Sequence, residues 1–287
     1  MKLLVHIDAP DRALEIVARR HPDVAVAVCR DYASMGDALA RERPDAVYTV
    51  RFAGTPGYPR EAMLSAPSLK WIAVGGSGTD HLMPWDTGRL TVTNSAGVAA
   101  EAMAQYIIGG ILHFTLGFAG FARQQRDHFW NKASAVETVT GRTMAILGLG
   151  KTGQAVAKVA KALDMRVVGI RARPAPTAHV DRVEPMEQLH SVLGVADFVV
   201  VCLPLTPATR GLIDAAAFAA LKPGAILVDV SRGGIVRQAA LFDALKSGRL
   251  RGAVLDVFET EPLPGESPLW DMDNVIVTPH CSSVYDG

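Results

Sequence analysis

Short apolar runs alternate with segments of helical periodicity in the first part of the chain. Four apolar runs predict buried strands, at 2–7, 24–29, 46–50 and 71–74. Two segments between them have the spacing of amphipathic helices, 12–20 and 35–43. Strands that alternate with helices usually pair in parallel, so this part is expected to be a small α/β domain.

The same alternation continues after a predicted long helix at about 98–121 and a polar, irregular segment at 123–140. Further apolar runs predict strands at 144–147, 166–170, 198–203, 225–230, 252–257 and 275–278. The predicted fold class is α/β, with two doubly wound parallel-sheet domains at 1–93 and 94–280. Residues 281–287 are expected to rejoin the first domain.

A glycine pattern follows the strand at 144–147 and precedes a predicted helix at 154–163. Gly148, Gly150 and Gly153 have G-x-G-x-x-G spacing, and the flanking strand, helix and strand supply the context that makes this pattern specific. The first glycine allows a tight turn, the second lets backbone approach a pyrophosphate, and the third lets helix and strand pack closely. The larger domain is therefore predicted to be a Rossmann dinucleotide-binding domain, with Leu149, Lys151 and Thr152 completing the turn, and the smaller one flavodoxin-like.

The residue after the second strand of this unit indicates which dinucleotide binds. An acidic residue there accepts a hydrogen bond from the ribose 2′-hydroxyl of NAD(H), but this chain has Arg171, with Arg173 close behind. Guanidinium groups pair with a 2′-phosphate, so we expect NADP(H), with NAD(H) as the weaker alternative. The other reading is an exposed pair of solubilising arginines.

Composition excludes several classes of partner. Lys and Arg total 29, as do Asp and Glu, and the net charge of zero argues against nucleic acid or an anionic membrane as a partner. The three cysteines, Cys29, Cys202 and Cys281, lack the spacing of a disulfide or zinc framework. No metal site is predicted, and the chain is expected to be cytoplasmic.

Four small residues, Gly75, Gly76, Ser77 and Gly78, follow the strand at 71–74. Successive backbone N–H groups in such a stretch can form a nest for a carboxylate, which predicts substrate binding; a flexible turn is the simpler alternative. In the larger domain, Arg232, Glu261 and His280 each stand just past a predicted strand, at the edge where open α/β sheets bind ligands.

Ordered motifs along almost the whole chain resemble those of the D-isomer-specific 2-hydroxyacid dehydrogenase family. The matching blocks are VGGSGTD at 74–80, VTNSAG at 92–97, the glycine turn at 148–153, LPLTP at 203–207, SRGG at 231–234, LDVFETEP at 255–262 and TPH at 278–280. Several motifs in the same order are far more specific than any one of them.

The resemblance implies a role for each matching residue. Arg232 would bind the substrate carboxylate and keto oxygen, His280 would be the general acid, and Glu261 would hold the imidazole and favour its charged form. Gly76 and its neighbours would bind the substrate carboxylate, and Asn94 would help to hinge the domains. The expected cofactor contacts further along the chain are Leu203, Pro204, Thr206, Pro207 and Asp256.

Within the family, Arg171 and the segment at 265–270 look most like NADPH-dependent glyoxylate/hydroxypyruvate reductases. Formate dehydrogenases carry glutamine in place of Glu261, whereas phosphite-type dehydrogenases and dinucleotide-sensing corepressors keep a similar triad and stay open as alternatives. A homodimer is expected by family resemblance. The family pattern continues past His280 into a helix that returns to the first domain, so the resemblance implies either a longer protein or loss of that contact.

Overall fold

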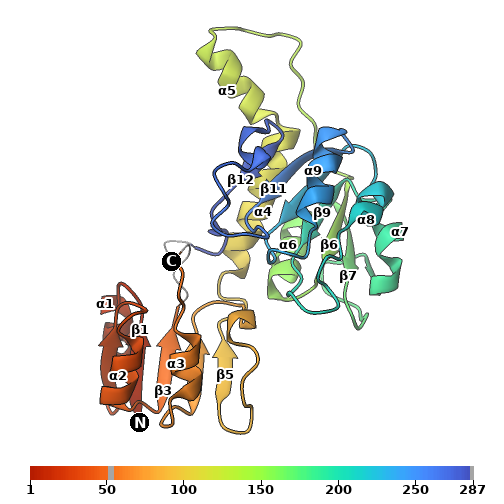
Figure 1. Cartoon of the computed structure of the whole chain (residues 1–287). Helices are drawn as coiled ribbons and strands as arrows, with labels where there is room; N and C mark the ends of the chain where they lie inside the picture. The colour runs from red at the N-terminus through yellow and green to blue at the C-terminus, as the bar shows by residue number, and fades with distance from the viewer. Residues whose placement is uncertain (51–54, 285–287) are drawn as a thin grey trace. The chain divides into compact units, whose positions relative to one another are not determined.

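Two units, Met1–Ala96 and Gly97–Gly287, make up the computed structural model, and each has its own parallel sheet (Figure 1). The structure describes residues 1–50 and 55–284. The expected return of 281–287 to the first domain involves residues 285–287, which lie outside the described ones.

The first unit contains a five-stranded sheet in the order β2-β1-β3-β4-β5. Its strands are β1 (Lys2–His6), β2 (Ala25–Cys29), β3 (Ala46–Thr49), β4 (Trp71–Val74) and β5 (Thr91–Asn94). Its helices are α1 (Asp11–Arg20), α2 (Met35–Glu42), α3 (Arg60–Ser65) and the 3₁₀ turn η1 (Asp80–Leu82). This strand order is the flavodoxin-like one, which confirms the predicted class.

The core of the first unit forms where the sheet meets α2 and α3. Leu4 of β1 and Ile72 of β4 are fully buried, together with Met35 of α2 and Met63 of α3. Helix α1 has no buried residue, whereas α2 and α3 each have at least one.

The second unit contains a seven-stranded parallel sheet in the order β12-β11-β10-β9-β6-β7-β8. Its strands are β6 (Thr143–Leu147), β7 (Arg166–Ile170), β8 (Arg182–Glu184), β9 (Phe198–Val201), β10 (Ala225–Asp229), β11 (Leu250–Leu255) and β12 (Val275–Val277). From β6 the chain runs outward to β8, then returns to the other side of β6 and runs outward to β12. This is the dinucleotide-binding order, in which the switch point lies beside β6.

Helices cover both faces of this sheet, as Figure 1 shows. On one face, Met144 and Ile146 of β6 pack with α4 (Ala100–Thr115) and α6 (Lys151–Ala162). On the other face, Ala145 and Leu147 pack with α7 (Leu189–Leu193), α8 (Ala215–Ala220) and α9 (Gln238–Lys246). Alternate residues of β6 thus enter opposite cores, which is why its sequence is apolar throughout. The remaining 3₁₀ turns are η2 (Met186–Gln188) and η3 (Pro268–Asp271).

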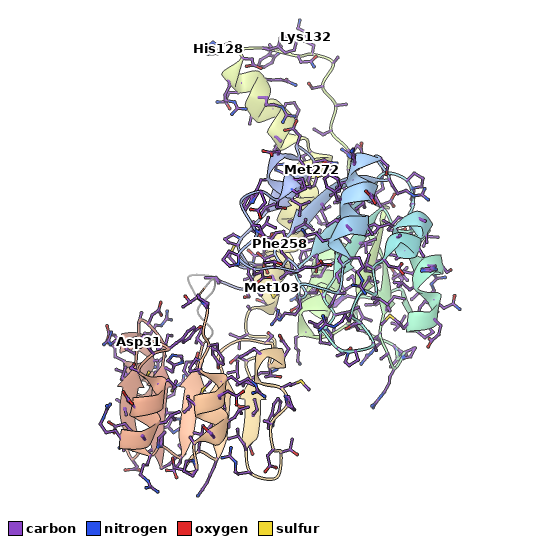
Figure 2. The ribbon with its side chains drawn as sticks, in the orientation of Figure 1. Asp31, Met103, His128, Lys132, Phe258 and Met272 are labelled. Carbon is purple, nitrogen blue, oxygen red and sulfur yellow. The ribbon has the colours of Figure 1, made fainter. Side chains whose placement is uncertain are left out.

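The predicted helix at 98–121 is wrong as a single element. Helix α4 ends at Thr115 and α5 (Phe118–Arg126) starts a new direction, with a bend of 58° between them. The break lies at Gly117, whose φ of +68° is in the left-handed region that ends helices. Helix α5 and the following residues project from the sheet as an arm (118–136), and Figure 2 shows His128 and Lys132 at its far end.

Among the described residues, no single helix has both the length and the apolar composition needed to cross a membrane. The bent pair α4 and α5 meets that criterion only when its two helices are counted together.

Candidate active site

The glycine turn lies between β6 and α6, at the switch point of the seven-stranded sheet. Gly148 has φ of +102°, and a Cβ atom on it would lie 2.8 Å from the carbonyl oxygen of Cys202. A Cβ on Gly153 would overlap the carbonyl oxygen of Gly148. Both glycines are therefore required by the backbone itself.

Gly150 differs from these two glycines because a Cβ atom on it would meet nothing within 4 Å. The open space lies at the N-terminus of α6, a helix that starts at Lys151. Helix N-termini have unpaired N–H groups and a partial positive charge. The turn consequently fits a pyrophosphate, with Gly150 as the position of closest backbone approach.

The other residues of the turn direct their side chains elsewhere. Leu149 is buried and packs against Gly169, and the Thr152 hydroxyl donates to Sδ of Met103, 3.6 Å away. Figure 2 labels Met103 in the second unit. Methylene groups of the Lys151 side chain pack against Gly97. Leu149 and Thr152 can therefore contribute to a phosphate site through their backbone N–H groups.

Arg171 follows β7 directly and lies beside the glycine turn. Ile170 pairs with Leu147 across the two strands, and the N–H of Gly148 donates to the Ile170 carbonyl at 2.9 Å. Arg171 is half-buried and Arg173 is exposed. This register places the backbone of Arg171 beside the glycine turn, at the end of the second strand, where the ribose 2′ position is recognised in such folds.

The loop after β9 contains Leu203, Pro204, Thr206 and Pro207, and a buried threonine organises it. The Thr209 hydroxyl donates to the Pro204 carbonyl at 2.7 Å and accepts from the Thr206 N–H at 2.8 Å. Two bonds to one side chain fix the path of the loop beside the glycine turn.

Arg232, Glu261 and His280 follow β10, β11 and β12, which are neighbours in the sheet. Nδ1 of His280 lies 2.8 Å from Oε2 of Glu261, and Oε1 of Glu261 accepts from the Phe258 N–H at 3.0 Å. The two side chains are 31% and 28% exposed. An imidazole held at Nδ1 by a carboxylate, with access to solvent, is equipped for proton transfer at Nε2.

Arg232 lies on a turn that is fixed by the carboxylate of Asp229. The Ser231 N–H and hydroxyl both donate to Oδ1 of Asp229, and Nη1 of Arg232 donates to the Ser231 carbonyl at 2.7 Å. Burial raises the pKa of Asp229 to about 7, and the nearby Asp256 and Glu261 add to the rise. The turn also contacts the loop after β11, because a Cβ on Gly233 would overlap the Phe258 carbonyl oxygen.

The small-residue loop at 75–78 belongs to the first unit and follows β4. Its backbone is held by β5 and the residue after it: the Asn94 side-chain amide donates to the Ser77 carbonyl at 2.7 Å, and the Ser95 N–H donates to the Gly76 carbonyl at 3.0 Å. A Cβ on Gly76 would meet nothing within 4 Å, whereas one on Gly75 would lie 2.6 Å from the Tyr48 hydroxyl. The loop is thus an ordered backbone surface with open space at Gly76.

A comparison with protein families matches residues 108–282 to the model for the D-isomer specific 2-hydroxyacid dehydrogenase NAD binding domain. The chain belongs to this family. The match contains the glycine turn and the Arg232, Glu261 and His280 turns described above.

Curated relatives include a phosphoglycerate dehydrogenase and a glyoxylate reductase. D-3-phosphoglycerate dehydrogenase of Mycobacterium leprae is 37% identical over 223 residues, which are 77% of this chain and 42% of that protein. The chain thus spans less than half the length of the curated relatives that match first. Glyoxylate reductase of Thermofilum pendens is 35% identical over 232 residues, 78% of this chain and 68% of that protein.

Solved structures of family members have the same fold. A 2-hydroxyacid dehydrogenase from Xanthobacter autotrophicus, in complex with NADPH and MES, has a TM-score of 0.82 and 32% identity, covering 99% of this chain and 89% of that one. A glyoxylate/hydroxypyruvate reductase from Sinorhizobium meliloti, in complex with NADP and sulfate, has a TM-score of 0.82 and 28% identity, covering 98% and 88%.

Sequence reasoning about this family member missed four polar residues beside the site: Tyr106, Thr209, Asp229 and Thr278, the last of which was noted only within a motif. Tyr106 hydrogen-bonds Thr278, with 2.6 Å between the two oxygens, and Thr278 in turn donates to Asp256. The available signal was a hydroxyl or carboxyl group inside an otherwise apolar segment, as for Tyr106 in α4 and Asp229 at the end of β10.

Proposed function

We propose that this chain reduces a small 2-keto acid of the glyoxylate or hydroxypyruvate type to the D-2-hydroxy acid, with NADPH as reductant. The observation that carries the proposal is the pairing of His280 with Glu261 beside the Arg232 turn, at the edge of a dinucleotide-binding sheet. We assign substrate binding to the first unit and dinucleotide binding to the second.

In this scheme, the backbone of the turn from Gly148 to Gly153 holds the pyrophosphate at the N-terminus of α6. Arg171 and Arg173 pair with the 2′-phosphate, and Asp256 accepts from the nicotinamide amide. When bound, the dinucleotide supplies the hydride, so the protein has to position the substrate and supply one proton.

The guanidinium of Arg232 binds the substrate carboxylate and polarises the keto oxygen. For the first unit, we assign a carboxylate-binding role to the backbone of 75–78. As hydride reaches the carbonyl carbon, the protonated imidazole of His280 gives its Nε2 proton to the keto oxygen, which becomes the hydroxyl. Glu261 keeps Nδ1 oriented and stabilises the imidazolium.

The choice of NADPH rests on Arg171, which stands where an acidic residue would select NADH. The Xanthobacter and Sinorhizobium proteins were solved with NADPH and NADP, respectively. A second candidate is oxidation of D-3-phosphoglycerate, because five curated relatives are named D-3-phosphoglycerate dehydrogenase. Arg232 would serve both substrates through the shared carboxylate.

We also propose a homodimer assembled through the arm. Phe129 and Trp130, on the arm, are 60% and 86% exposed, an unusual state for large apolar side chains. Light scattering of the purified protein tests this assembly, and Trp130→Ser is expected to shift the mass toward the monomer.

The decisive experiment follows the absorbance of NADPH with glyoxylate, hydroxypyruvate and pyruvate, with NADH run in parallel. D-3-phosphoglycerate with NAD⁺ and NADP⁺ is assayed beside them. Turnover of a 2-keto acid with NADPH supports the proposal, and activity only with phosphoglycerate supports the second candidate. Tight NADPH binding without turnover of any of these acids would contradict both and favour a dinucleotide sensor.

A further inference from the structure

One carboxylate holds the turn that contains His280. Oδ1 of Asp256 accepts from the Thr278 hydroxyl at 2.6 Å and from the Cys281 N–H at 2.8 Å, and Oδ2 accepts from the Ser282 N–H at 3.0 Å. Asp256 is 1% exposed. These bonds lie on both sides of His280 in the sequence, so the position of the histidine depends on them.

The backbone of His280 needs such support. Its φ of +54° is in the left-handed region, which costs a residue with a Cβ on the order of 1 kcal/mol. Its N–H donates to the Thr278 carbonyl at 3.0 Å and so closes a tight turn. A residue persists in this conformation only where its surroundings determine it.

The network continues from the turn to helix α4. The Tyr106 oxygen lies 2.6 Å from the Thr278 hydroxyl, although the two residues are 172 positions apart in the sequence. A carboxylate only accepts hydrogen bonds, so the Thr278 hydrogen is committed to Asp256. Tyr106 must therefore donate to Thr278, and the order of donors is Tyr106 to Thr278 to Asp256.

Tyr106 is well suited to donate a hydrogen bond to Thr278. Its neighbours on α4, Ala104 and Ile107, are buried against the seven-stranded sheet. The packing of the helix therefore fixes the position of Tyr106. Its hydroxyl is protonated and able to donate throughout the neutral range, and burial raises the pKa of Tyr106 further, to about 12.

We propose that Tyr106, acting through Thr278 and Asp256, is a positioning residue for the general acid His280. The inference rests on the proposed function, because it assigns Tyr106 to the same proton transfer. Asp256 accepts three hydrogen bonds from this turn, two at Oδ1 and one at Oδ2.

The test compares Tyr106→Phe, Thr278→Val and Thr278→Ser with the unchanged protein. Loss of one hydrogen bond of this kind corresponds to a fall in kcat of about five- to tenfold for Tyr106→Phe. Thr278→Val, which breaks both bonds, should lower kcat by about a hundredfold. Thr278→Ser keeps the hydroxyl and should stay within about twofold of the unchanged protein. The KM for the keto acid and the Kd for NADPH should hardly move.

The split between kcat and KM separates positioning from general weakening of the fold. A variant that is only less stable keeps its kcat per folded molecule, whereas a variant that misplaces His280 lowers kcat at an unchanged KM. The matched control is Thr115→Val, which removes a buried hydroxyl of α4 that bonds the Ile111 carbonyl of its own helix. It should leave kcat unchanged.

A kcat of Tyr106→Phe equal to that of Thr115→Val would overturn the inference. So would a Thr278→Ser protein as slow as Thr278→Val. If the unchanged protein turns over none of the acids tested, the proposed function fails, and the network is tested by amide hydrogen exchange instead. Faster exchange at Cys281 and Ser282 in Tyr106→Phe then supports the network, and equal exchange overturns it.

Discussion

Nδ1 of His280 lies 2.8 Å from Oε2 of Glu261, and the other oxygen of that carboxylate accepts from the backbone N–H of Phe258. The Phe258 N–H therefore fixes the carboxylate of Glu261, which in turn orients the imidazole of His280. Because Glu261 belongs to the loop after β11 and His280 to the turn after β12, the pair also joins two strand ends.

Glu261→Gln should keep a side chain of the same shape but remove its negative charge. Without that charge the side chain no longer stabilises a protonated imidazole that donates its Nε2 proton. We expect kcat to fall by about ten- to a hundredfold, as for loss of support to a general acid. Steady-state kinetics with a keto acid at one neutral pH check this, and an unchanged kcat would show that Glu261 does not act on His280.

Arg232→Ala should remove substrate capture and leave cofactor binding intact. A charge-assisted bidentate pair contributes about 2 kcal/mol or more, so kcat/KM for a keto acid should fall at least about thirtyfold. Arg166→Ala is the matched control, because Arg166 is an exposed arginine at the amino end of β7, opposite the ligand edge. Equal kinetics for the two variants would exclude Arg232 from the site.

Arg171→Asp should shift the preference from NADPH toward NADH. The carboxylate repels a 2′-phosphate and accepts from a 2′-hydroxyl, so the ratio of the two kcat/KM values should change by about a hundredfold. Arg166→Asp supplies the same change of charge on the same strand, away from the turn. If NADPH remains preferred by the original margin, the 2′-phosphate is recognised by other residues.

Gly150→Ala should weaken NADPH binding, whereas Gly153→Ala should destabilise the fold. The methyl group on residue 150 enters open space, so the free energy of unfolding should change by less than about 1 kcal/mol while NADPH binding weakens. The methyl group on residue 153 overlaps the Gly148 carbonyl, so the fold itself should lose about 3 kcal/mol or more. Urea unfolding and NADPH fluorescence titration separate the two, and equal stability losses would contradict the geometry.

Asp229→Asn tests the buried carboxyl group below Arg232. Its pKa is raised from 3.8 to about 7, so between these values the folded protein keeps a proton that the unfolded chain has lost. The contribution of Asp229 to stability is therefore full below pH 4 and is lost as pH rises through 7, by at most about 1.4 kcal/mol per pH unit.

Asparagine has no such titration and still offers an oxygen to Ser231. The difference in unfolding free energy, variant minus unchanged protein, should rise by about 2 kcal/mol between pH 5 and pH 7.5. Urea unfolding at both pH values measures this, and a constant difference would mean that Asp229 is ionised throughout. Ionisable groups that do not interact with Asp229 are common to both proteins and cancel in this difference.

Much of the fold could be predicted because buried parallel strands have unmistakable sequences. The run FVVV of β9 and the apolar β6 can hardly be anything but central strands. Short elements with mixed composition, such as β8 and α3, lack this signal and were missed. The break between α4 and α5 was missed because the predicted helix contains four glycines, and only the φ of Gly117 shows at which of them the chain turns.

The site divides in the same way. His280, Glu261 and Arg232 could be singled out because each follows a predicted strand, and strand order brings the ends of β10, β11 and β12 together. Tyr106 could be noticed as a hydroxyl in an apolar helix, but its partner could not be predicted, because nothing in a sequence relates a helix residue to a turn so far along the chain. Long-range hydrogen bonds of this kind depend on the packing of whole elements.

The contact between Gly233 and the Phe258 carbonyl limits which residue a related sequence can carry at this position. No side-chain carbon fits at position 233, so a chain can keep this active-site backbone only with glycine there. A descendant that retained arginine at 232 and histidine at 280 but lost this glycine would have had to reroute the loop after β11, and Glu261 with it. Gly233, which has no side chain, is thus a better marker that this backbone arrangement is preserved than the arginine beside it.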